Sequence, residues 1–201
     1  MPLHPDKLRA LSPHLPLPAS LLFDGGNDWQ EGMITQMECF GTTVITRPER
    51  APGRPLSNIE TNLLALRALG VASQTVADTF GMHPRQLGRQ ESAVCRLFQV
   101  HDSHGVFGPA VHHSIEIGIL DVRAREPEGF GLETVIAVEA LMDGVAIGAA
   151  AMRHKLPPKT VRGAAEELQQ QHGIEDELGL ILLAHAKGML GYDPFAGAEH
   201  L

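Results

Sequence analysis

The sequence predicts a mostly α fold in which two tandem four-helix units follow a short N-terminal segment. From Leu56 onward, apolar residues recur at helical spacing, and glycine or proline marks the helix ends. The chain also repeats at an offset of 74 residues, which aligns Gly70 with Gly144. Aromatic residues make up only 4% of a chain that is 43% hydrophobic, which favours small cores of Leu, Val and Ala over a large aromatic-lined cavity.

Residues 1–55 have a different pattern and are expected to form an N-terminal segment and linker. Its stretch "LSPHLPLPAS" is rich in proline and indicates no clear helix. The stretch "GMITQMECFGTTVITRP" alternates loosely on both sides of Phe40-Gly41 and predicts a β-hairpin. The run "RPERAPGRP" then has the composition of a linker.

Residues 56–120 predict the first four-helix unit. A stripe of leucines ends at Gly70, a typical residue after a helix end, and a shorter helix follows over 72–80. Pro84 occupies the first position of a third helix, where its missing N–H costs nothing, and that helix runs over 84–97. The stretch "FGPAVHHSIEIGIL" predicts the fourth helix.

The second unit is predicted from the repeat, over 132–201 including a C-terminal tail, after a linker at 121–131. At the offset of 74, Ala77 meets Ala151 and Pro84 meets Pro158 without a gap. The matches fall at the turn after the first helix, at inward positions of the second and at the start of the third. The third helix of the second unit is therefore expected over 158–170.

The run "LSNIETNLLALRALGVASQTVADTFGMHPRQLGRQESAVCRLFQV" resembles the LuxR-type (GerE-like) DNA-binding helix-turn-helix domain. Leu56, Ser57 and Glu60 match the opening of that family's run, and Thr160-Val161-Arg162 of the second unit is close to its Thr-Val-Lys. The framework matches in register at these positions: Gly70, Val76, Ala77, Phe80, Met82, Leu87, Val94, Phe98 and Val100. The resemblance covers about 120 residues and implies a bacterial transcription regulator whose third helices, 84–97 and 158–170, lie in the DNA major groove.

Four positions depart from the family pattern. His83 and Pro157 stand where a capping Ser is usual, and neither is expected to cap its helix as well. Gly88 replaces the Lys of the first recognition helix, and Glu91 lies unusually on its inward face. The second unit is therefore expected to make the stronger DNA contact.

The proposed DNA-contacting residues lie on the outward faces of the two third helices and in the turn before the second. Arginine can donate two hydrogen bonds to guanine, and lysine binds phosphates. Residues 84–97 carry three arginines against one glutamate, or +2, whereas residues 152–165 carry four cations and no acid, or +4. The proposed residues are Arg85, Gln86 and Arg89, with Arg96, in the first unit, and Arg153, Lys155, Lys159, Thr160 and Arg162 in the second.

The whole chain carries a net charge of −8, which argues against broad nucleic-acid binding but leaves room for a local basic face. The expected partner is double-stranded DNA, with a homodimer or a partner regulator left open. Two units in one chain could read two half-sites without a homodimer, provided that the linker permits the spacing. The rival hypothesis is an interaction module that packs on another regulator, which the acidic charge and Glu91 favour.

Other patterns predict neither a cofactor nor an enzyme. His101, His104, His112 and His113, with Asp102 among them, are read as surface histidines rather than as a metal site, because no ligand spacing supports one. Cys95 is expected to be a buried, inert thiol rather than a redox switch, and Cys39 adds no disulfide framework. No apolar run approaches the roughly 20 residues that cross a bilayer, and no signal peptide is recognised, so a cytoplasmic protein is expected.

Overall fold

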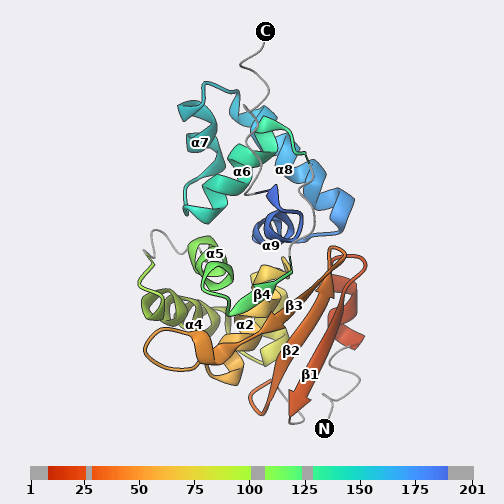
Figure 1. The fold of residues 1–201 in the computed structure, drawn as a ribbon, viewed down its shortest axis with the longest axis vertical. Helices are drawn as coiled ribbons and strands as arrows, with labels where there is room; N and C mark the ends of the chain where they lie inside the picture. The colour runs from red at the N-terminus through yellow and green to blue at the C-terminus, as the bar shows by residue number, and fades with distance from the viewer. Residues whose placement is uncertain (1–8, 26–28, 101–106, 124–128, 190–201) are drawn as a thin grey trace.

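The computed structural model describes residues 9–25, 29–100, 107–123 and 129–189. A four-stranded antiparallel sheet lies at one end of the molecule, with helices beside it and a second group of helices at the other end (Figure 1). The strands follow one another in the sheet in chain order: β1 (Ser20–Gly25), β2 (Gly32–Cys39), β3 (Thr42–Thr46) and β4 (Leu120–Val122). The fold is therefore mixed α/β.

The predicted fold class, mostly α with tandem LuxR-like helix-turn-helix units, is wrong. The predicted hairpin exists, because β2 and β3 pair through a turn in which Phe40 and Gly41 both have positive φ angles, of 51° and 74°. However, β1 extends it on one side and β4 on the other. Strand β4 comes from residues expected to end the fourth helix and begin a linker, and it pairs Leu120 with Thr46.

The sheet is part of the main core, because the helix that it covers is buried on all sides. Helix α2 (Asn58–Ala68) is buried from Glu60 to its end. Its Asn62 accepts a hydrogen bond from the Ile34 N–H at 2.7 Å. The Asn62 side-chain nitrogen donates to the carbonyls of Trp29, at 3.0 Å, and Gly32, at 2.9 Å. One buried amide thus saturates three backbone groups around β2 and fixes the sheet on α2.

The start of α2 is held by charged and polar side chains. The Glu60 carboxylate accepts the Ser57 N–H at 2.8 Å, and the Ser57 hydroxyl accepts the Glu60 N–H at 3.3 Å, which makes a capping box. Two hydrogen bonds from Arg54, of 2.6 and 2.8 Å, lower the pKa of Glu60 to about 2. Ser57 and Glu60, which matched the family opening, therefore have a local structural use.

The remaining helices form two groups. The first helical half comprises α2, α3 (Ser73–Phe80), α4 (Pro84–Leu97) and α5 (Gly108–Glu116). The second helical half comprises α6 (Leu132–Met142), α7 (Ile147–Arg153), α8 (Pro158–His172) and α9 (Gly179–Ala186). The helix predicted over 84–97 is confirmed, and α8 runs two residues beyond its predicted end. Helix α5 ends earlier than predicted, because Gly118 turns the chain with a φ of 74° toward β4.

The backbone repeats at the offset seen in the sequence. The amides of Gly70 and Gly144 donate to carbonyls three residues earlier, at 3.0 and 3.2 Å, and both glycines have positive φ angles, of 78° and 66°. Further along, the amides of Met82 and Leu156 donate to carbonyls five residues earlier, both at 2.9 Å. The assignment of 1–55, 56–120, 121–131 and 132–201 to separate domains or linkers stays a prediction.

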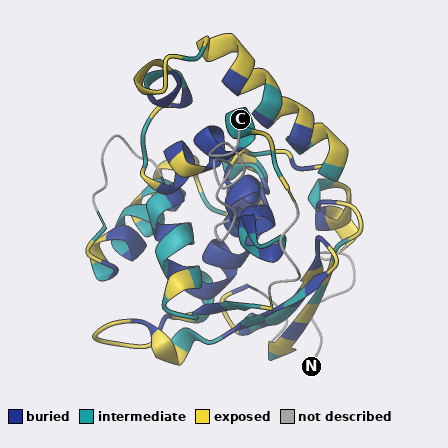
Figure 2. Ribbon diagram, turned by 45° about the horizontal axis from the view of Figure 1, so that its top comes forward, coloured by how far each residue is buried: buried dark blue, intermediate teal, exposed yellow. Residues whose placement is uncertain are grey.

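The two helical halves meet where α5 of the first half packs against α9 of the second, near the middle of the molecule in Figure 1. Helix α9 is buried over almost its whole length, as Figure 2 shows for the centre of the molecule. By contrast, α8 keeps an exposed side along its length. Within the described residues, no helix combines the length and apolar character that a membrane crossing requires.

Candidate nucleic-acid interface

The exposed face of α4 carries three arginines. Arg85, Arg89 and Arg96 are all exposed, and their spacing of four and seven residues places them on one side of the helix. With Gly88 and Ser92 they line a shallow hollow of about 410 Å³. Gly88, which replaces a lysine of the family pattern, has no atom within 4 Å of where a Cβ would stand, so this side of the helix is open.

The first turn of α4 is capped by its own side chains, which corrects one expectation. The His83 Nδ1 accepts the Arg85 N–H at 3.2 Å, and the Gln86 side-chain oxygen accepts the His83 N–H at 2.9 Å. His83 therefore does cap the helix. Gln86 is exposed as predicted, but its oxygen is engaged in the cap, so its NH₂ group is the part left for a base or phosphate.

Glu91 does not share the arginine face. Its carboxylate lies 3.1 Å from the Nε of Arg67 on α2, and its side chain is only 16% exposed. The charge of +2 counted from the sequence therefore understates the positive charge of the outward face of α4. The charged side chains on that face are all arginines. Glu91 lies on the inward side of α4 because it pairs with the buried Arg67.

The second basic group surrounds the turn between α7 and α8. All five residues predicted there are exposed: Arg153, Lys155, Lys159, Thr160 and Arg162. Val161 is fully buried and anchors the helix between its exposed neighbours. Pro157 precedes α8 without a side-chain hydrogen bond to the first turn, as expected. The sequence thus placed these side chains on the surface correctly.

Acidic side chains lie next to this second basic group, near Arg162 and in the later turns of α8. Burial and neighbouring Asp176 raise the pKa of Glu177, and the charge of Arg162 opposes that rise. Arg162 therefore shares its surroundings with a carboxylate. Glu166 and Glu167 are both exposed in the next turns of α8, so the basic part of the helix is its first half.

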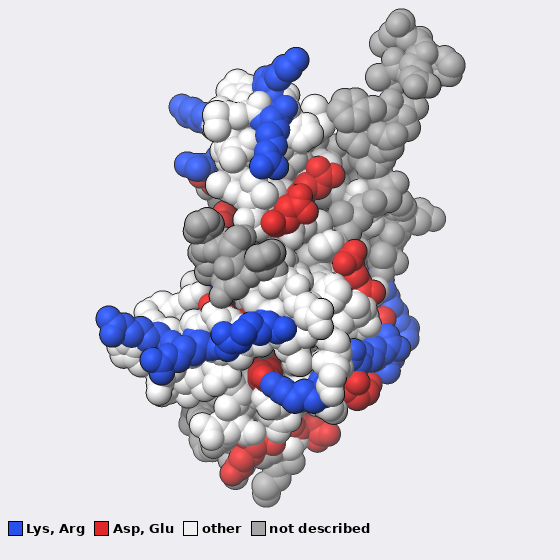
Figure 3. Space-filling view, turned by 90° about the vertical axis from the view of Figure 1, so that its left-hand side faces the viewer, with Lys and Arg blue, Asp and Glu red and all other residues white. Residues whose placement is uncertain are grey.

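The cations of these two groups differ from several arginines elsewhere. Arg47 lies 2.9 Å from Asp121, Arg54 lies 2.6 Å from Glu60, and Arg67 has two carboxylate partners. In the part of the chain that the structure describes, no such ion pair involves Arg85, Arg89, Arg96, Arg153, Lys155, Lys159 or Arg162. Figure 3 shows a lower band and an upper group of Lys and Arg side chains on the side where α4 and α7 lie.

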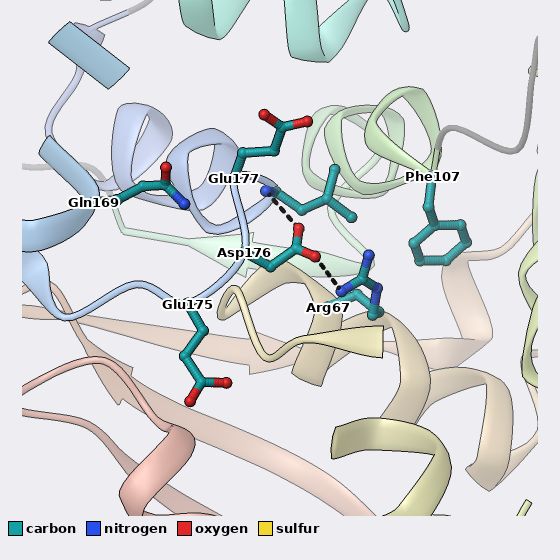
Figure 4. A pocket seen from close by; sticks show the side chains of 7 residues that line it. Arg67, Phe107, Gln169, Glu175, Asp176 and Glu177 are labelled. Atoms are coloured by element: carbon teal, nitrogen blue, oxygen red, sulfur yellow. Dashed lines mark hydrogen bonds and ion pairs between the residues drawn. The ribbon is translucent and has the colours of Figure 1, made fainter. Parts of the chain in front are cut away.

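A different cleft, of about 430 Å³, lies at the seam between the two helical halves and is acidic (Figure 4). Its Asp176 accepts hydrogen bonds from Arg67 and from the Leu178 N–H, both at 3.0 Å. Its Glu175 bonds His14 at 2.7 Å. Two of its three carboxylates thus hold the structure together, and their charge makes the cleft unsuitable for phosphate.

The histidines and cysteines are placed as follows. His101, His104 and Asp102 lie outside the described residues. His112 and His113 lie on α5, within the predicted fourth helix, but they are half-buried rather than surface histidines. Both cysteines are buried, as expected for Cys95, and burial raises the pKa of Cys39 to about 12. Among the described residues, no three His, Cys, Asp or Glu side chains are grouped so that they could hold a metal ion.

Two side-chain networks could not be predicted from the sequence, because they join distant parts of the chain. The buried Arg67 network connects α2, α4 and the loop before α9, and only a buried arginine within an apolar helix hinted at it. The His112 Nδ1 lies 3.0 Å from the His185 Nε2 on α9. The pairing of His112 with His185 leaves no local signal in the sequence.

Comparison with family models, curated proteins and solved structures finds no match to this chain. The resemblance to LuxR-type regulators thus gains no support from these comparisons. The function is therefore inferred from the two basic groups themselves.

Proposed function

We propose that this chain binds double-stranded DNA through the exposed face of α4 and through the α7–α8 turn with the first half of α8, and that it acts as a transcription regulator. The observation that carries the proposal is the gathering of exposed cations, without ion-pair partners in the described residues, on one side of an otherwise acidic protein. A surface that gathers cations of one sign raises the local concentration of an anionic ligand such as DNA.

The chemistry of each group suits DNA. Lysine and arginine bind phosphates and release condensed counterions, which supplies most of the affinity. Exposed arginines near the start of a helix, such as Arg85 and Arg89, can reach guanine edges with two hydrogen bonds each. Lys159 and Thr160 lie in the first turn of α8, where a helix N-terminus also attracts phosphate.

A partner protein with an acidic surface is the alternative. Its support is Met152, which is 66% exposed beside Arg153 and would give such a partner an apolar contact. Glu91 no longer supports it, because its carboxylate turns inward to Arg67.

The test is the binding of labelled genomic duplex fragments to the full chain over a series of salt concentrations. We expect affinity to fall steeply with salt, and the double variant Lys159→Ala with Arg162→Ala to bind at least tenfold more weakly, with a salt slope smaller by about 2. Both positions are exposed, and alanine favours a helix, so the variant should fold.

The matched control is Arg9→Ala with Arg123→Ala, which removes the same two charges from exposed positions outside α4, α7 and α8. The control should bind like the unmodified chain. Equal losses in both double variants would indicate a general charge effect, and salt-insensitive binding would contradict the proposed interface.

A further inference from the structure

The two helical halves touch through reciprocal contacts. Gly179, the first residue of α9, packs directly on Gly70, just after α2. A Cβ on either glycine would collide with the Ile174 side chain and with the other glycine. In the opposite sense, Gly108, the first residue of α5, packs on the carbonyl of Leu141 near the end of α6. Each half thus places the start of its last helix against the end of the other's first helix, which is the pattern of a two-fold interface.

The seam between the halves is also pinned by polar bonds. The Asp176 N–H donates to the Gly70 carbonyl at 2.8 Å, and the Asp176 carboxylate accepts from Arg67 at 3.0 Å. Buried Arg67 simultaneously holds Glu91 of α4. The position of α4 is therefore tied to the loop that connects α8 with α9, so these contacts couple the placement of the two basic groups.

We infer that a single chain binds one DNA duplex with both basic groups at once. Its two helical halves then act as the two subunits of a symmetric dimer would. This inference rests on the proposed function. A near two-fold relation between the halves matches the two-fold axis of duplex DNA, on which paired reading elements meet successive groove segments. Figure 3 shows Lys and Arg side chains in a lower band and an upper group on the side where α4 and α7 lie, so a duplex that follows this side would meet both.

The two segments of DNA would differ in sequence, because the two basic groups differ in chemistry. Helix α4 offers Arg85 and Arg89 near its start, which suits guanines. Helix α8 offers Lys159 and Thr160, and the preceding turn adds Lys155. The preferred site is therefore bipartite and asymmetric, in contrast to the palindrome that a homodimer of identical units would read.

The experiment uses the full chain and duplexes of about 24 base pairs selected from a random-sequence pool, more than two helical turns. Native mass spectrometry of the saturated complex should give one chain per duplex. Arg85→Ala with Arg89→Ala and Lys159→Ala with Arg162→Ala should each weaken binding at least tenfold, and Arg9→Ala with Arg123→Ala should not. An insertion of about five base pairs between the selected segments should weaken binding more than an insertion of about ten.

Two outcomes would overturn the inference but leave the proposed function standing. One is a complex of two chains per duplex. The other is full affinity in the Arg85 and Arg89 double variant while the Lys159 and Arg162 variant loses binding, which would remove α4 from the proposed interface but keep DNA binding through the α7–α8 turn. Absence of duplex binding by the unmodified chain at low salt would overturn the proposed function itself, and this inference with it.

Discussion

Arg67 and Asp176 stand 109 positions apart in the chain, and the Arg67 Nη1 donates a 3.0 Å hydrogen bond to the Asp176 carboxylate. The Arg67 side chain is only 7% exposed, and it also donates to the Val71 carbonyl at 2.7 Å and to Glu91 at 3.1 Å. A single buried guanidinium therefore ties the first helical half to the second.

Replacing Arg67 should be among the most destabilising changes in the chain. Arg67→Met keeps most of the side-chain volume but leaves two largely buried carboxylates without their cation, so we expect the free energy of unfolding to fall by about 3–5 kcal/mol. Denaturant unfolding followed by circular dichroism measures the loss. Glu166→Ala, at an exposed position, is the control and should change stability by less than about 0.5 kcal/mol. Similar stabilities for the two variants would contradict the proposed role of Arg67.

Asn62 should be essential for docking the sheet. Asn62→Leu removes three hydrogen bonds and leaves buried backbone groups of Ile34, Trp29 and Gly32 unpaired, which we expect to cost about 3 kcal/mol or more. Asn58→Ala is a matched control, because partly exposed Asn58 also donates to carbonyls of the 30–31 turn but water can replace it. The control should lose less than about 1 kcal/mol in the same unfolding measurement.

The pairing of His112 with His185 leads us to expect that the protein loses stability in mild acid. Burial, and then the neighbouring His112, lower the pKa of His185 to about 4 from its ordinary value near 6.5. Because the folded state disfavours the charged form, this contribution is fully present above about pH 6.5 and is lost as the pH falls toward 4. We expect a decrease of roughly 3 kcal/mol across that window.

The His185→Leu variant identifies the source of this pH dependence. Its free energy of unfolding, measured by denaturant titration from pH 7.5 to 4, should vary less with pH than that of the unmodified chain. The charged neighbours of the pair on α5, Glu116 and His113, are present in both proteins. An unchanged slope in the variant would show that His185 is not the source of the acid sensitivity.

Neutralising the acidic end of the α8 surface should strengthen DNA binding. Glu166→Gln with Glu167→Gln removes two exposed charges that follow the basic half of the helix, so we expect a several-fold gain in duplex affinity at low salt that shrinks as salt is raised. Fluorescence anisotropy with a labelled duplex measures it. Glu133→Gln with Glu139→Gln on α6 removes the same charge elsewhere, and an equal gain there would show that net charge alone is responsible.

Much of the surface of the proposed site could be predicted from the sequence, because exposure follows the helical period. Arg85, Arg89 and Lys159 are exposed as the pattern indicated, and Val161 turns inward between exposed neighbours. The electrostatic character of α4 could not be predicted in full. Counted from the sequence, the charge of Glu91 reduces the basic character of α4. The structure shows instead that Glu91 pairs with Arg67 on another helix.

The sequence by itself determined the local elements of this protein: the helix over 84–97, the turn at Phe40-Gly41 and the backbone repeat at an offset of 74 residues. Glycine, proline and apolar spacing act within a few residues of the chain, so a single sequence reveals them. Only the tertiary structure decided that the fold is mixed α/β. The pairing of β4 with β3 and the bonding of Asn62 to β2 join segments far apart in the chain, and non-local pairings depend on packing and burial rather than on local pattern.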